Sequence, residues 1–157
     1  FKDKLLSLQC LDTDGNIKVI PSNQIKFGYR NVEIEENLIY LSATFQGNLS
    51  EKNKIKNQMD KLAKKKNNSQ PSKIKTSGST FKNPIDQTDE KAWELIKNSV
   101  PKDINFGDAY ISEKHSNFFV NKNNASFEDM YSLINYVKKN VKEKKGINMN
   151  LEIKIVE

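Results

Sequence analysis

The chain has 157 residues, of which 36% are hydrophobic, and it carries a formal net charge of +6. This length suits one domain or two small ones, and the single cysteine, Cys10, excludes an intrachain disulfide and a cysteine-rich metal site. No apolar run approaches the ~18 residues of a membrane-spanning helix, and no signal peptide is evident. Residues 54–75 hold eight lysines against Asp60 alone, so most of the positive charge lies in this segment.

The first third of the chain has the pattern of strands. Leu5–Leu11 is apolar and β-prone, residues 12–16 have turn composition, and Ile17–Ile20 predicts a returning strand. Residues 37–47 alternate, which predicts a half-buried strand with four residues on its apolar face: Ile39, Leu41, Ala43 and Phe45. Since a strand pattern begins almost at once and no methionine precedes it, we expect the chain to start within a larger protein.

A lysine-rich helix and a loop are predicted next. Ser50 is a plausible N-cap for a helix of about four turns, with Ile55, Met59 and Leu62 on one face and its end at residues 64–66. Residues 67–78 have no periodicity, so we expect a connecting loop and a domain boundary there.

The second half of the chain mixes helices with short strands. We expect a short helix capped by Thr88 or Asp89 and stopped by Pro101, with Ala92, Trp93 and Ile96 facing inward. Residues 108–112 and 117–121 predict strands.

The clearest helix of the chain opens at Ser126, which begins a capping box. Met130, Ile134, Val137 and Val141 follow at helical spacing, and Gly146 predicts the end of the helix. The alternation over residues 149–155 predicts a final strand. Because strands and helices occur without regular βαβ alternation, the predicted fold class is α+β.

Few residues suggest chemistry on their own. No phosphate-binding glycine motif is present, and His115 is the only histidine, which excludes a multi-histidine metal site. Residues 50–80 contain no aromatic residue that could stack on a base, so the lysines predict a solvated helix face rather than a nucleic-acid site. Taken on its own, Arg30 predicts a surface ion pair near the acidic run at residues 33–36. Glu152, taken on its own, predicts a solvent-exposed side chain.

Residues 78–84 read G-S-T-F-K-N-P, a mixture that a simple turn does not need. One interpretation is a loop in which Gly78 adopts a positive φ and Phe81 enters the core. The other is a site, in which a hydroxyl, a cation and an amide lie beside backbone exposed by glycine.

Several segments, taken together in their order, favour the second interpretation. They are F-G-Y-R at 27–30, Q-P at 70–71, G-S-T-F-K-N-P at 78–84, A-W-E-L-I at 92–96, G-D-A-Y-I-S-E-K-H-S-N-F-F-V-N at 107–121, N-N-A-S-F-E-D at 123–129, and Glu152 in the last strand. In these segments the chain resembles the C-terminal half of the UDP-N-acetylenolpyruvoylglucosamine reductase family, in the shorter of its two types.

The resemblance implies a cytoplasmic flavoprotein oxidoreductase of peptidoglycan synthesis, and hence of cell wall biogenesis, cell shape and cell division. NADPH and FAD would be its cofactors, and UDP-N-acetylglucosamine enolpyruvate its substrate. Residues 1–66 would complete the FAD-binding domain, residues 67–77 would be a linker, and residues 78–157 would form the substrate-binding domain. Neither a nucleic acid nor a membrane is expected as a partner.

The resemblance also implies roles for individual residues. Arg30 would bind the substrate carboxylate, Ser79 would donate the proton, and Glu152 would be the acid beside that carboxylate. Tyr29, Lys82 and Asn83 match substrate-contacting positions.

The chain departs from the family pattern at several places. Val32 replaces a usual serine, and Asn150 replaces the first glutamate of the last strand. Within residues 97–103, Lys97 replaces a usual acidic residue, and residues 99–103 replace a turn that contains two glycines. The flavin phosphate loop of the family is also absent from these residues. The alternative function is therefore a non-catalytic remnant or a stand-alone module that binds an anion or a nucleotide-sugar.

Overall fold

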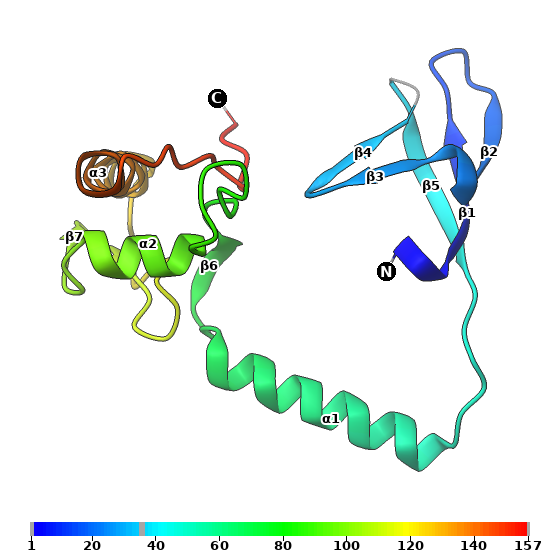
Figure 1. Ribbon diagram of the computed structural model, residues 1–157, viewed down its shortest axis with the longest axis horizontal. Helices are drawn as coiled ribbons and strands as arrows, with labels where there is room; N and C mark the ends of the chain where they lie inside the picture. The colour runs from blue at the N-terminus through cyan, green and yellow to red at the C-terminus, as the bar shows by residue number, and fades with distance from the viewer. Residues whose placement is uncertain (1, 35–36, 157) are drawn as a thin grey trace. The chain divides into compact units, whose positions relative to one another are not determined.

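The computed structural model describes residues 2–34 and 37–156, which divide into two compact units, one up to Ile55 and one from Lys56 onward. Helices and antiparallel sheets are mixed along the chain, so the predicted α+β class is confirmed (Figure 1). None of the helices in the described ranges is long and apolar enough to span a membrane. The domain limits expected from the resemblance stay a prediction.

The first unit is built from short strands. After a 3-10 turn (η1, Lys2–Lys4), β1 (Leu5–Leu11) pairs antiparallel with β2 (Ile17–Pro21) on one side and with β5 (Ile39–Phe45) on the other. A second 3-10 turn (η2, Ser22–Gln24) leads to the hairpin of β3 (Lys26–Gly28) and β4 (Asn31–Glu33). The predicted strands at 5–11 and 17–20 are therefore confirmed.

The strand predicted at residues 37–47 exists as β5, but the prediction that it is half-buried is wrong. All seven residues of β5 are exposed among the described residues. The small core of this unit lies elsewhere, around Leu5, Cys10, Ile20 and Ile25. Alternation therefore identified the strand, whereas burial depends on what covers the sheet.

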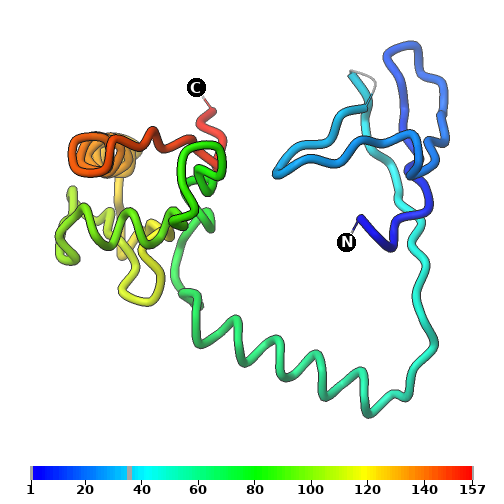
Figure 2. The backbone as a smooth tube through the Cα atoms, in the orientation of Figure 1, coloured from blue at the N-terminus to red at the C-terminus, as the bar shows by residue number. Residues whose placement is uncertain are grey.

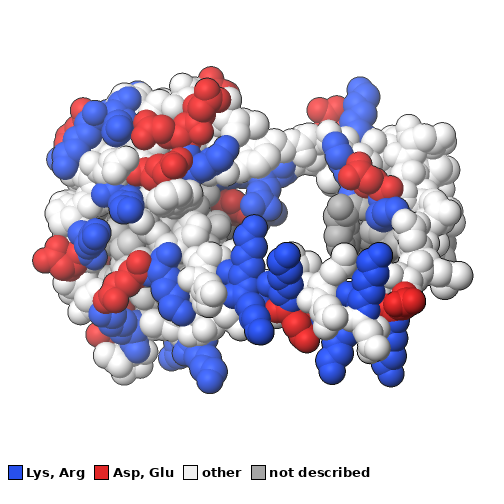
Figure 3. Space-filling model, turned by 60° about the horizontal axis from the view of Figure 1, so that its bottom comes forward, with Lys and Arg blue, Asp and Glu red and all other residues white. Residues whose placement is uncertain are grey.

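Helix α1 (Lys52–Ser69) is longer than predicted and fully exposed. It continues past the lysine run to Ser69, whose hydroxyl donates to the carbonyl oxygen of Lys65 at 2.9 Å. No residue of this helix is buried, so its apolar stripe does not pack against a core. Figure 3 shows basic side chains projecting outward along the helix, as expected for a solvated face.

The loop predicted at residues 67–78 is only partly present. Its beginning belongs to α1, and its end belongs to β6 (Lys75–Ser79), which pairs antiparallel with β9 (Phe118–Asn121). The prediction missed β6 because the hydrogen bonds of this polar strand come from a distant partner, which local periodicity does not reveal.

The second unit contains a four-stranded antiparallel sheet in the order β6-β9-β8-β7. The predicted strands at 108–112 and 117–121 are confirmed as β8 (Ala109–Ile111) and β9, and the short β7 (Asn105–Phe106) had no clear sequence signal. Helix α3 (Phe127–Lys145) contacts β7, β8 and helix α2 (Ala92–Ser99) (Figure 1), and the core lies among these elements.

Helix α2 (Ala92–Ser99) differs from the prediction at its start and in one facing residue. It begins after Lys91, whose backbone N–H donates to the Glu94 carboxylate at 2.7 Å, so a cap at Thr88 or Asp89 is wrong. Ala92 and Ile96 are buried as predicted, whereas Trp93 is 37% exposed.

Helix α2 ends at Ser99, where the segment that departs from the family pattern begins. The backbone N–H of Val100 bonds to the Ile96 carbonyl oxygen at 3.0 Å, and Lys144 donates to the Ser99 carbonyl oxygen at 2.9 Å. These bonds close the helix end without the usual glycines, and Pro101 follows it as predicted.

Helix α3 (Phe127–Lys145) is confirmed with both predicted ends. The Ser126 hydroxyl accepts from the Asp129 N–H at 3.1 Å, and the Asp129 carboxylate accepts from the Ser126 N–H at 2.9 Å. Gly146 closes the helix at φ 73°, a left-handed conformation that glycine adopts without strain. The predicted inner face is buried or half-buried against the core.

The strand predicted at residues 149–155 is wrong. These residues form only one isolated bridge, between Phe81 and Leu151, instead of a ladder along a partner strand. Figure 2 shows the C-terminal segment, in red, returning to the green segment that follows β6. This return brings the C-terminal segment beside the stretch that follows β6.

Candidate functional site

The end of β6 presents Ser79 on an irregular stretch of backbone. Pairing with β9 shifts register between Thr76 and Ser79, and Gly78 lies there at φ 91°, the positive φ expected from the sequence. The Thr76 hydroxyl holds this bulge, donating to the Phe119 carbonyl oxygen at 2.7 Å and accepting from the Gly78 N–H at 3.2 Å. Ser79 is half-buried directly after it.

The two residues after Ser79 are fixed from the core side. The Phe81 side chain is 1% exposed and meets Phe119 edge to face, with ring centroids 5.8 Å apart, which confirms the predicted anchor. Asn117 holds the backbone, because its carbonyl oxygen accepts from the Thr80 N–H at 2.8 Å and its side-chain amide bonds Phe81.

The C-terminal segment pairs with the other edge of this stretch. The Glu152 N–H donates to the Thr80 carbonyl oxygen at 2.9 Å, and the Lys82 N–H donates to the Asn150 carbonyl oxygen at 2.9 Å. The structure therefore brings together the backbone segments that carry Ser79 and Glu152, which lie 73 positions apart in the sequence. Glu152 is half-buried rather than solvent-exposed.

The side chain of Asn83 supports the fold at this point. Its Oδ1 atom accepts from the Ala92 N–H at 2.9 Å and so satisfies a backbone donor at the start of α2. This cap ties the residues that follow Ser79 to α2. The role of Asn83 toward a substrate, like that of Lys82, stays a prediction.

Tyr29 and Arg30 lie in the first unit, in the turn between β3 and β4. Arg30 adopts a positive φ of 56°, and its guanidinium lies 5.8 Å from the centre of the Tyr29 ring, within the range of a cation–π contact. In the acidic run that follows, Glu33 pairs with Lys26 at 3.8 Å, whereas residues 35 and 36 lie outside the described residues. The predicted role of Arg30 toward a carboxylate stays a prediction.

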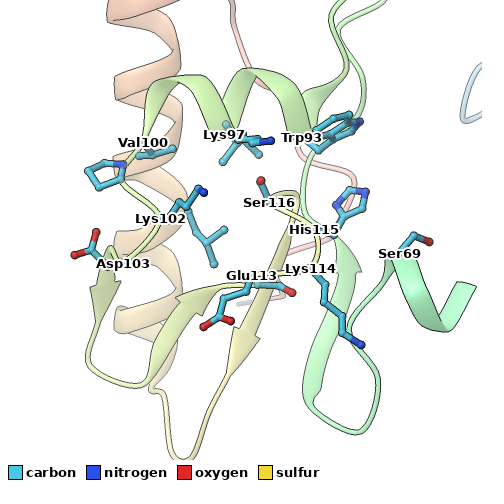
Figure 4. A pocket seen from close by; sticks show the side chains of 14 residues that line it. Ser69, Trp93, Lys97, Val100, Lys102, Asp103, Glu113, Lys114, His115 and Ser116 are labelled. Carbon is cyan, nitrogen blue, oxygen red and sulfur yellow. The ribbon is translucent and has the colours of Figure 1, made fainter.

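A pocket of about 780 Å³ opens in the second unit between α2 and the loop before β9. Figure 4 shows Trp93 and Lys97 coming from α2, with His115 and Ser116 on the facing loop. Three lysines, at 97, 102 and 114, share its lining with Asp103 and Glu113. The pocket therefore combines an aromatic ring with a small excess of positive charge.

His115 connects this pocket to the Ser79 stretch. Its ring packs edge to face on Phe118, with centroids 4.8 Å apart, and its Nδ1 accepts from the Asn117 N–H at 3.2 Å. Burial lowers the pKa of His115 below its ordinary value, which favours the neutral imidazole that can accept this bond. The His115 ring thus supports the backbone at Asn117, and the expectation that it has no catalytic role stays a prediction.

Residues the sequence did not single out complete the site. Asn117 bonds the backbone of both Thr80 and Phe81, yet its only signal was its place inside the S-E-K-H-S-N-F segment. The pocket itself was not predicted, although part of its walls lies in the segments 92–96 and 107–121, because no local pattern shows that these segments face each other.

The second unit is an antiparallel sheet packed with two helices. Two of its chain segments, which carry the Ser79 hydroxyl and the Glu152 carboxylate, pair through their backbones. These features define a small α+β binding or catalytic domain. The profile of the family described as "UDP-N-acetylenolpyruvoylglucosamine reductase, C-terminal domain" matches residues 70–156, more than half of the chain. The chain therefore belongs to this family.

Individual relatives agree with the profile. Over 99% of its length the chain is 58% identical to a protein from Pelagibacter ubique named UDP-N-acetylenolpyruvoylglucosamine reductase, covering 52% of that protein. A Rickettsia typhi protein of the same name is 36% identical over 98% of the chain, which covers 51% of it. The chain thus spans about half the length of these curated relatives.

A solved structure extends the likeness to three dimensions. The crystal structure of UDP-N-acetylenolpyruvylglucosamine reductase from Thermus caldophilus superposes with a TM-score of 0.81 at 28% sequence identity. The match covers 99% of this chain and 54% of the other. The α+β fold described above is therefore the fold of this family.

Proposed function

We propose that this chain is the C-terminal portion of an enzyme that reduces UDP-N-acetylglucosamine enolpyruvate to UDP-N-acetylmuramate for peptidoglycan synthesis. The observation that carries the proposal is the family match over residues 70–156. The backbone pairing of residues 80 and 152 supports it, because it brings the chain segments of two proposed catalytic residues together. The enzyme would act in the bacterial cytoplasm.

The proposed chemistry assigns a proton transfer to Ser79. Hydride addition at C3 of the enolpyruvyl group leaves an electron pair at C2 that delocalises onto the carboxylate. Ser79 then gives its proton to C2. Arg30 and a protonated Glu152 beside the carboxylate would stabilise this charge more in the transition state than in the ground state. A serine hydroxyl is a weak acid, so it serves only once C2 has become strongly basic.

The reaction needs a hydride, which FAD reduced by NADPH supplies when bound. The residues of this chain do not fit the pyrophosphate of FAD, because none of the helices in the described ranges begins behind a glycine-rich loop. In the first turn of α2 the Ala92 N–H already bonds Asn83 Oδ1 at 2.9 Å, and in the first turn of α3 the Asp129 N–H bonds the Ser126 hydroxyl at 3.1 Å. The flavin phosphates would therefore be held outside these residues.

This reasoning gives a direct test on the chain alone. After mixing with FAD and desalting, the protein should retain no stoichiometric flavin absorbance. A yellow protein with one FAD per chain would contradict the proposal and would mean that these residues contain a phosphate site.

The remaining assignments concern substrate contacts. Tyr29, Lys82 and Asn83 would contact the nucleotide-sugar, in two units that the enzyme would use together. The lysines of α1 would not bind nucleic acid, since their helix is exposed and carries no aromatic side chain. The FAD-binding and substrate-binding portions would divide near residues 66–78.

The decisive experiment uses a chimera in which the part of the Pelagibacter protein that this chain does not cover precedes residue 1. Ser79→Ala should leave reduction of the flavin by NADPH near normal in stopped flow. It should slow turnover of the enolpyruvyl substrate about 10²–10⁴-fold, the usual size of general acid catalysis. Substrate affinity should change little, because the lost interaction belongs to the transition state.

Two further variants sharpen this experiment. Ser79→Cys should recover part of the rate, since a thiol also donates a proton, whereas Ser72→Ala, at an exposed serine, should leave it unchanged. If Ser79→Ala slows flavin reduction or leaves turnover unaffected, Ser79 is a turn residue and not the proton donor.

A second candidate function, binding of a nucleotide-sugar without catalysis, is favoured by the lysine-lined pocket at α2. The chain has one tryptophan, Trp93, and it lies in this pocket. Fluorescence quenching of the chain by UDP-N-acetylglucosamine, combined with an inactive chimera, would support this function over the enzymatic one.

A further inference from the structure

Asn117 joins the loop before β9 to the two residues that follow Ser79. Its Oδ1 atom accepts from the Phe81 N–H at 2.9 Å, and its Nδ2 atom donates to the Phe81 carbonyl oxygen at 2.8 Å. Its own carbonyl oxygen accepts from the Thr80 N–H at 2.8 Å. One residue thus forms three hydrogen bonds to two consecutive backbone units.

The burial of Asn117 makes these bonds important. The residue is only 5% exposed, so water cannot easily replace a lost partner, and a buried polar group left without a partner destabilises the fold. Its amide offers a donor and an acceptor side by side, which matches the N–H and C=O of one residue in an extended chain. Aspartate has the acceptor without the donor, and alanine has neither.

The residues that Asn117 holds lie between Ser79 and Glu152. Thr80 bonds Asn117 through its N–H and Glu152 through its carbonyl oxygen, at 2.8 and 2.9 Å. Thr80 itself is 1% exposed. A shift of the Asn117 backbone would therefore move both the segment that presents Ser79 and the segment that presents Glu152.

We propose that Asn117 is a positioning residue that sets the placement of Ser79 and Glu152 for the proton transfer. This inference rests on the proposed function for its catalytic consequence. The placement itself follows from the hydrogen bonds and does not depend on the proposed function. Asn117 needs no contact with substrate, since it acts through the backbone of residues 80–82 and 150–152.

The chain contains a matched control for this role. Asn121, at the other end of β9, bonds the backbone of Ala125 in the same two-atom manner, with Oδ1 accepting at 3.0 Å and Nδ2 donating at 3.4 Å. Asn121 is half-buried and holds the approach to α3. Replacing it removes a similar pair of bonds without touching the Ser79 stretch.

The first measurement is amide hydrogen exchange in the 157-residue chain, followed residue by residue by NMR. Asn117→Asp and Asn117→Ala should speed exchange at Phe81, Lys82 and Glu152, with the larger effect for alanine. Asn121→Asp should speed exchange near Ala125 and leave those three amides unchanged. Unchanged exchange in both Asn117 variants would overturn the proposal.

The second measurement is catalysis in the chimera. Asn117→Asp should lower turnover by about 10²-fold, since a displacement near 1 Å in a catalytic group costs about that much, whereas flavin reduction by NADPH and turnover of Asn121→Asp should stay near wild type. In the Ser79→Ala background, Asn117→Asp should have a much smaller effect.

The two proposals fail differently. An equal effect of Asn117→Asp with and without Ser79 would overturn the positioning role while leaving the enzyme assignment intact. A chimera that is active but whose turnover is unaffected by Ser79→Ala would contradict the proposed role of Ser79 as proton donor, and would overturn the catalytic role of Asn117 with it; a chimera with no turnover at all would contradict the proposed function. The exchange measurement still decides the backbone placement, because it needs no activity.

Discussion

Among the described residues, the part of the chain from Lys56 onward buries thirteen hydrophobic residues in one cluster, whereas the part up to Ile55 buries four. The second unit packs two amphipathic helices against its sheet. The first unit leaves all of β5 exposed and has only short strands to close its core. Because burial of apolar surface is the main driving force of folding, we expect the second unit to be much more stable than the first.

The most severe test of this comparison separates the units. Residues 56–157 alone should fold, with dispersed NMR signals and a cooperative thermal transition, because their core is contained within them. Residues 1–55 alone should show neither, since so small a domain buries too little surface to offset its chain entropy. Cooperative unfolding of the 1–55 fragment would remove the contrast between the units.

Truncating a leucine side chain should likewise have very different effects on stability in the two units. Leu133→Ala, at a fully buried position of α3, should destabilise the second unit by about 2–5 kcal/mol. Leu41→Ala, on exposed β5, should leave the same transition unchanged. Urea unfolding followed by Trp93 fluorescence reports the second unit alone, because the chain has no other tryptophan.

The helix ends should give a smaller difference. Ser126→Ala removes the N-cap of α3 and should cost about 1 kcal/mol, read from the same fluorescence transition. Ser50→Ala, near the exposed α1, should not shift that transition, because α1 buries no residue. A destabilisation of similar size in both variants would mean that α1 supports the second unit.

The smallest expected effect is a difference in pH dependence. Burial lowers the pKa of His115, so unfolding takes up a proton as the pH falls below about 6.5. Stability of the second unit should therefore be full above that pH and decline below it. His115→Gln should flatten this decline in a series of urea transitions between pH 7.5 and 5.

The first unit should respond in a more acidic window. Hydrogen bonds from the backbone N–H of Asn16 lower the pKa of Asp12 in the β1–β2 turn. Its contribution is present above its ordinary value of 3.8 and is lost as the pH falls through the lower folded value. NMR shifts of the turn should change only in that acid range, and a change near pH 6 would contradict the assignment.

Local signals were sufficient for some elements of this fold. The ends of α3 are set by Ser126, Asp129 and Gly146, each acting within its own helix turn, so the sequence predicted both. The turn residues 12–16 lie directly between β1 and β2 in the sequence, so a local pattern predicted this hairpin. The positive φ of Gly78 and the burial of Phe81 likewise follow from the residue types.

Elements that depend on distant partners were predicted less well. β6 is polar and irregular, and it is a strand because β9 pairs with it. Residues 149–155 alternate like a strand, yet only Leu151 meets a partner in a bridge. Thr88 and Asp89 have the composition of a helix cap, but the helix begins at Ala92, whose N–H bonds to Asn83 Oδ1.

By itself, the sequence determined the α+β class, the identity of most elements and the motifs that place the chain in its family. These depend on periodicity, on capping and turn residues, and on the order of short segments, all of which are local or linear properties. Only the tertiary structure decided that the Ser79 and Glu152 segments pair through Thr80, and that Asn117 holds the pair from the core side. Those contacts join residues far apart along the chain. The buried amide of Asn117 therefore has its partners only in the folded structure, where the core surrounds it.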